Sequence, residues 1–126
     1  MQPELLARGV CRLEAIEMGS TDISREQAQA VFAAIARERT LTRLCIGFNN
    51  LSTVQPADMA IAVNRLEKVD MSNTQLATHQ VNCILRQCVE GDTKLKMLWL
   101  WCDNMDVDQD IFRRAVEKLG DGLKQL

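Results

Sequence analysis

The sequence predicts an α/β solenoid in which short parallel strands line a concave face and helices line the convex face. The first observation behind this prediction is a long repeat: the pair Gln2-Pro3 returns as Gln55-Pro56, and residues 13–18 align with residues 66–71. The second is a shorter apolar pattern that occurs four times, with starts 28, 25 and 29 residues apart at Leu13, Leu41, Leu66 and Leu95. Self-similarity at such periods is typical of arrays in which each unit buries its apolar face on the next.

Each copy of the shorter pattern predicts one strand and the turn that follows it. The pattern reads L-x-x-L-x-L-x-x-N/T-x-L, and its second copy runs from Leu41 through Leu44 and Ile46 to Leu51. The two central apolar positions alternate with exposed positions at a period of two, as expected for a strand with one buried face. A short polar residue follows whose side chain can hydrogen-bond the turning backbone. In the four copies this residue is Thr21, Asn49, Thr74 or Asp103.

Capping signals predict helices between the strands. Ser24 and Gln27 form a capping-box pattern ahead of apolar residues at helical spacing from Ala28 to Ile35. Residues 79–90 carry apolar side chains on one helix face, and Gly91 follows as a stop signal.

Two prolines and one aspartate mark the beginnings of further helices. Pro3 and Pro56 suit the first turns of two short helices at residues 4–10 and 57–64. Asp108 can cap a helix that extends to Leu119. Strands and helices therefore alternate along the chain.

The whole chain, residues 1–126, is predicted to be one domain with a partial repeat at each end. A fifth copy of the pattern is broken near Leu119 or Leu123, where Gly120 and Gly122 are expected to weaken any further strand. No dedicated cap is recognisable before the first unit, although solenoids normally carry one. These features favour a segment of a longer array or an engineered minimal array.

Composition points to a soluble protein of the cytoplasm. The net charge of −2 gives no general attraction to nucleic acid or to anionic membranes. No apolar run approaches the roughly 18 residues needed to span a bilayer, and the first residues do not resemble a signal peptide. The five cysteines show no paired spacing, which favours reduced thiols.

The four frames resemble the ribonuclease-inhibitor-like class of leucine-rich repeats over essentially the whole chain. Residues 66–76 and 41–51 are similar to the two repeat types that alternate in animal cytosolic arrays, including the sensor ends of NOD-like receptors. The resemblance implies a right-handed α/β horseshoe that recognises a protein through its concave face. It implies no particular partner, because the fixed letters of the motif are core residues.

The exposed strand positions are the candidate binding residues. Ordered by strand, they form columns along the array, of which the first two read Ala15, Arg43, Lys68, Met97 and Glu17, Cys45, Asp70, Trp99. On the fourth strand Leu98 and Leu100 point inward, so Trp99 and Trp101 point to solvent. Exposed clusters of this kind are typical of interface hot spots. The candidate partner-binding residues are Met97, Trp99, Trp101 and Phe48 as apolar anchors, Arg43, Lys68 and Asp70 as polar guides, and the flanking Cys45 and Cys102.

Other uses of the tryptophan surface stay open. A following repeat, a terminal segment or a second copy of the chain could cover it, so a structural or self-associating segment with no separate ligand is the alternative function. A small-molecule pocket between Trp101 and the row of Gly47 and Ser72 is a third possibility.

Catalysis, a cofactor and a metal site are not expected. Glu17 and Asp70 share a column across Cys45, but carboxylates on a flat strand surface with no base or cleft nearby do not make an acid–base pair. The single histidine, His79, begins a convex helix, away from Cys45 and Cys102. Cys88 is expected in the core, whereas Cys45 and Cys102 are expected to be exposed thiols.

Overall fold

A computed structural model describes residues 2, 3, 5, 15–20, 22–37, 41–100 and 107–125. Short strands alternate with helices throughout this part of the chain. In order, the elements are β1 (Ala15–Glu17), α2 (Arg25–Arg37), β2 (Arg43–Cys45), α3 (Pro56–Arg65), β3 (Lys68–Met71), α4 (Thr78–Glu90), β4 (Met97–Leu100), α5 (Gln109–Leu119), the 3₁₀ turn η1 (Gly120–Gly122) and β5 (Leu123–Gln125).

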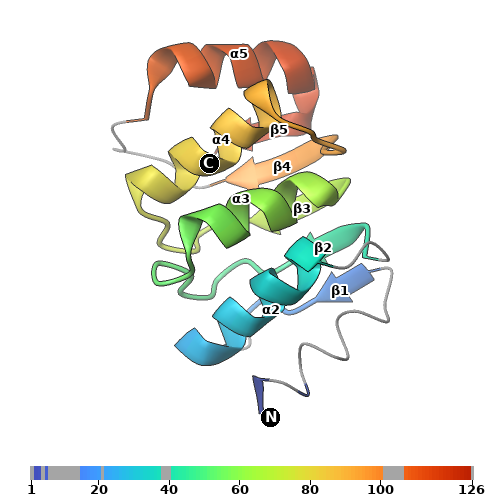
Figure 1. Ribbon diagram of the computed structural model, residues 1–126, viewed down its shortest axis with the longest axis vertical. Helices are drawn as coiled ribbons and strands as arrows, with labels where there is room; N and C mark the ends of the chain where they lie inside the picture. The colour runs from blue at the N-terminus through green and yellow to red at the C-terminus, as the bar shows by residue number, and fades with distance from the viewer. Residues whose placement is uncertain are drawn as a thin grey trace.

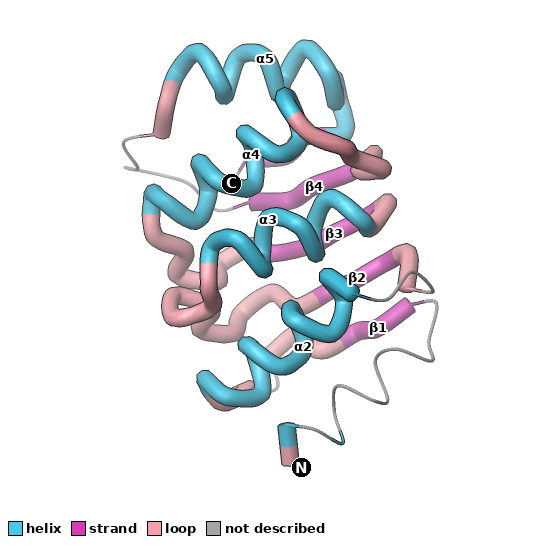
Figure 2. The backbone as a smooth tube through the Cα atoms, viewed as in Figure 1, coloured by secondary structure: helices cyan, strands magenta, loops and turns pink. Residues whose placement is uncertain are grey.

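The five strands form one parallel sheet whose order is the order of the chain, β1-β2-β3-β4-β5. A parallel pair needs a crossover connection, and in each case a helix supplies it. The helices are also neighbours in chain order, α2 beside α3, α3 beside α4 and α4 beside α5. Figure 1 and Figure 2 show the helices in one layer and the strands in another, so one face of the sheet carries no helix of the described part of the chain.

The core lies between the two layers. Leu44, Val69 and Leu98 are directly paired along the sheet, and each is buried. From the helix side Phe32, Met59, Ile84 and Ala115 pack against the same cluster. The period-two and helical patterns therefore predicted the inward face of these elements correctly.

Helix beginnings follow the capping chemistry that the sequence predicts. The Gln27 backbone N–H donates to Ser24 Oγ at 3.1 Å, and the Ser24 N–H donates to Gln27 Oε1 at 2.9 Å, which is a reciprocal capping box. Asp108 accepts from the backbone N–H groups of Asp110 and Ile111. Pro56 occupies the first turn of α3, where its missing N–H has no partner to lose.

A buried polar side chain holds the turn after β2 and the turn after β3. Asn49 Nδ2 donates to the carbonyl oxygens of Met18 and Ile46 at 2.7 and 3.1 Å, and its Oδ1 accepts from the Ile23 N–H at 3.0 Å. Thr74 Oγ1 donates to the Met71 carbonyl at 2.7 Å in the next unit. The predicted role of this position is confirmed at both residues.

The C-terminal strand is a correction to the sequence analysis. The prediction that Gly120 and Gly122 weaken any further strand is wrong, because β5 pairs with β4 in parallel. A side chain at Gly122 would overlap the backbone carbonyl of Lys96. The missing Cβ therefore permits the close approach that brings β5 onto the sheet.

Several predicted features lie outside the described residues, among them most of the helix at 4–10, Thr21, Asp103, Trp101 and Cys102. Within the described ranges, no helix combines the length and the apolar character required to cross a membrane.

Candidate binding surface on the open face of the sheet

The outward strand positions form two rows on the helix-free face. We call them the amino-end row (Ala15, Arg43, Lys68 and Met97) and the carboxyl-end row (Glu17, Cys45, Asp70 and Trp99). The parallel register pairs Ala15 with Arg43, Arg43 with Lys68 and Lys68 with Met97, and it pairs the second row in the same way. The two columns predicted from sequence are confirmed.

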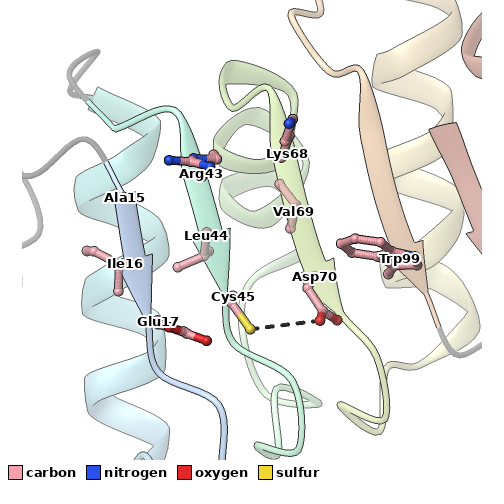
Figure 3. Close-up of a pocket in the computed structure, with 10 residues that line it drawn as sticks. All are labelled: Ala15, Ile16, Glu17, Arg43, Leu44, Cys45, Lys68, Val69, Asp70 and Trp99. Atoms are coloured by element: carbon pink, nitrogen blue, oxygen red, sulfur yellow. Dashed lines mark hydrogen bonds between the residues drawn. The ribbon is translucent and has the colours of Figure 1, made fainter.

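A concavity of about 490 Å³ crosses these rows. It is lined by β1, β2, residues 68–70 and Trp99, and Figure 3 shows these residues on four successive strands. The sequence analysis expected a flat surface without a cleft around Glu17 and Asp70. The concavity that both carboxylates line is shallow and open.

Trp99 forms one wall of the concavity but does not stand out into solvent. Its side chain is half-buried, and Figure 3 shows the indole ring extending from β4 toward β3. The predicted outward face is correct, whereas the predicted free exposure is not. A half-buried aromatic ring offers a flat apolar surface of the kind that anchors a partner.

Asp70 is oriented by its own turn. Its Oδ1 accepts from the Ser72 backbone N–H at 3.0 Å and from Ser72 Oγ at 2.7 Å. Its Oδ2 faces Cys45, whose thiol lies 3.8 Å away. The carboxylate is therefore fixed in direction, yet it makes no ion pair with any residue that the structure describes.

Cys45 is a half-buried free thiol between the two carboxylates of its row. Burial raises the pKa of this thiol, and the negative charge of Asp70 raises it further, with a smaller contribution from Glu17. The backbone N–H of Gly47 opposes this rise in pKa without reversing it. Cys45 is therefore a protonated thiol at neutral pH, which does not suit a nucleophile or a metal ligand.

Charge is separated between the two rows. Arg43 and Lys68 are adjacent in the amino-end row, and Glu17 and Asp70 lie in the carboxyl-end row. Positions two residues apart on a strand are separated by roughly 7 Å.

Glu17 was not among the predicted binding residues. Its place in the column with Cys45 and Asp70 was the signal that could have identified it.

The remaining predicted residues fall in different places. Met97 is half-buried at the end of the amino-end row, beside Lys68. Phe48 is 63% exposed in the turn after β2 and does not line the concavity. Cys88 is buried in α4, as predicted. Cys102 and Trp101 lie outside the described residues, so the predicted pocket between Trp101 and the row of Gly47 and Ser72 stays a prediction.

The part of the chain that the structure describes contains no group of three histidine, cysteine or acidic side chains that could hold a metal ion. His79 is exposed in the first turn of α4, in the helix layer. The concavity thus offers opposite charges, an aromatic wall and a neutral thiol, which is chemistry suited to recognition.

No protein-family model matches the chain, and no curated protein matches it.

Proposed function

We propose that the chain is an array of ribonuclease-inhibitor-like leucine-rich repeats that binds a protein partner through the open face of its sheet. The four frames in register and the alternation of parallel strands with helices support the repeat assignment. The array has no catalytic role and needs no cofactor in this proposal. The free thiols of Cys45, Cys83 and Cys88 fit a reducing compartment such as the cytosol.

One observation carries the binding proposal. The helix-free face combines a half-buried tryptophan with four charged side chains that make no ion pair with described residues: Glu17, Arg43, Lys68 and Asp70. Aromatic anchors beside charges that are not yet paired are typical of protein interfaces. Charges on the helix side are instead partly paired with one another, as Arg114 is with Glu90 at 3.7 Å.

A selection experiment tests the proposal. A randomised peptide library is panned on the immobilised intact chain, and the affinity of the enriched peptides is then measured for Trp99→Ala and for a helix-side control, Val116→Ala, at a 40% exposed site on α5. We expect Trp99→Ala to weaken binding by about tenfold or more and the control to bind like the intact chain. Peptides that lose affinity only with the control would contradict the proposal.

Self-association is the second candidate function. Strands β1 and β5 are the two ends of the described sheet, and each pairs on one side only within it. Unpaired strand edges can pair with another chain. Light scattering over a range of concentrations, on the intact chain and on Trp99→Ala, separates the candidates. A dimer that becomes monomeric in Trp99→Ala would favour self-association through the open face.

A further inference from the structure

Two carboxylates converge over Cys45 in the carboxyl-end row. Glu17 pairs with Cys45, and Cys45 pairs with Asp70, so the two acidic residues lie on either side of the thiol at two strand spacings, roughly 10 Å. Figure 3 shows the Glu17 carboxylate directed toward Cys45 from one side and the Asp70 carboxylate directed toward it from the other. We call this feature the acidic gap (Glu17, Cys45 and Asp70).

Glu17 and Asp70 form no ion pair with any residue that the structure describes. The ion pairs within the described part of the chain involve other acidic residues, namely Glu67, Glu90 and Asp110. Cys45 contributes only a neutral, weak donor to Asp70 Oδ2 at 3.8 Å. The raised pKa of the Cys45 thiol agrees with this, because both carboxylates act against ionisation of the thiol.

We propose that the acidic gap binds a basic side chain, arginine or lysine, of the protein partner. This inference rests on the proposed function and names the partner chemistry of the same face. A guanidinium or ammonium group placed over Cys45 would meet Asp70 Oδ2 on one side and Glu17 on the other. The Trp99 ring beside Asp70 provides an apolar face for the stem of that side chain or for its guanidinium plane.

The charges of the amino-end row indicate a second chemical feature of the partner. Arg43 and Lys68 would repel a uniformly basic segment, since they lie roughly 7 Å from the acidic gap along their strands. Arg43 and Lys68 therefore favour a partner segment that also carries an acidic group, roughly 7 Å from its basic group. A helix with a basic and an acidic residue four positions apart, about 6 Å along its axis, has the required spacing. A metal ion fits poorly, because the described residues offer no third acidic, histidine or cysteine ligand that would complete a metal site here.

The test uses the peptides enriched on the intact chain. Each enriched peptide is remade with its basic residues changed to glutamine, and affinities are measured for the intact chain and for the double variant Glu17→Gln plus Asp70→Asn. The amide oxygen introduced by Asp70→Asn would keep an acceptor for Ser72, so the turn after β3 is preserved, and circular dichroism checks the fold. Glu117→Gln on α5 is the matched control for loss of one surface carboxylate.

We expect one basic residue of each peptide to contribute about fivefold to affinity for the intact chain and nothing for the double variant. Added salt should weaken binding to the intact chain more than to the double variant. Peptides that need Trp99 but bind the double variant with unchanged affinity would overturn the proposal that the acidic gap binds a basic side chain. They would leave the proposed function standing. Acidic peptides that depend on Arg43 and Lys68 alone would overturn it as well. Peptides indifferent to every open-face substitution would instead remove the proposed function itself.

Discussion

Cys45 Sγ lies 3.8 Å from Asp70 Oδ2, across the boundary between two adjacent parallel strands. The contact joins a half-buried thiol to a carboxylate that is already fixed by Ser72. It places a neutral donor, and no cation, against a negative charge. The reactivity of the thiol and the charge of the open face are therefore coupled.

The first prediction concerns alkylation of Cys45. Only the thiolate reacts, and burial together with Asp70 raises the pKa of this thiol, so the reaction with iodoacetamide should be slow at neutral pH and accelerate as the pH rises. Asp70→Asn removes one cause of the raised pKa and should increase the rate at neutral pH. Peptide mapping by mass spectrometry follows Cys45, with Cys83 in the same sample as the control. An equal rate in both proteins would contradict the coupling.

The second prediction concerns Phe48, which has a φ of 60° and a mostly exposed side chain. A left-handed backbone is unfavourable for a residue with a bulky Cβ substituent, whereas asparagine tolerates it. Asn73 holds the same position after β3, with a φ of 52°. Phe48→Asn should therefore raise the free energy of unfolding by about 1 kcal/mol.

Urea unfolding measures the effect of Phe48→Asn, and Phe48→Ala is its matched control. Alanine removes the same ring but retains a Cβ and lacks a side chain that supports the left-handed conformation. Equal stability of the two variants would show that backbone conformation at this position contributes nothing.

The third prediction concerns Asn49, which is buried and whose side chain forms hydrogen bonds with backbone groups of both the first and the second unit. Asn49→Ala would leave the Ile23 N–H and the Met18 carbonyl without this partner, and buried polar groups without partners are costly. We expect a loss of about 3 kcal/mol in the free energy of unfolding.

Asn50→Ala is the control for Asn49→Ala in the same denaturation experiment. Asn50 is exposed, and its side chain accepts hydrogen bonds from Ser52 only within its own turn. Its loss should change stability by less than about 0.5 kcal/mol. Similar losses in both variants would contradict the linking role of Asn49.

The fourth prediction concerns the approach of Gly122 to the chain before β4. A methyl group at this position would overlap the Lys96 carbonyl, so Gly122→Ala should force β5 away from β4 and lower the free energy of unfolding by about 2 kcal/mol. Hydrogen exchange should show faster exchange in β5 than in the intact chain. Asp121→Ala, at the exposed neighbouring position, should leave both quantities nearly unchanged.

The periodicity of the sequence was enough to predict the strands and their inward faces. Leu44, Val69 and Leu98 recur at the same position of the frame, and burying them sets the outward direction of their neighbours. The two rows of the open face follow from that register alone. The sequence therefore located most of the candidate site, although it omitted Glu17.

The sequence did not reveal the contacts that tie one unit to the next. Gln80 is fully buried in α4 and donates to the carbonyl oxygens of Leu51 and Val54 at 2.9 and 2.8 Å. These partners are 29 and 26 positions away. Nothing in the local pattern distinguishes this glutamine from an exposed one, because its environment is created by the preceding unit.

Local periodicity by itself thus determined which residues of each strand face the core, since a strand reverses its side chains at every residue. Only the tertiary structure decided how the outward side chains lie, with Trp99 directed toward β3 and with Glu17 and Asp70 directed toward Cys45. It also decided the close approach of the Gly122 backbone to Lys96. These arrangements depend on contacts between residues that lie far apart in the chain and become neighbours only when the units stack. The inward faces of the strands follow from the periodicity of the sequence, whereas the chemistry of the open face follows from contacts between neighbouring strands.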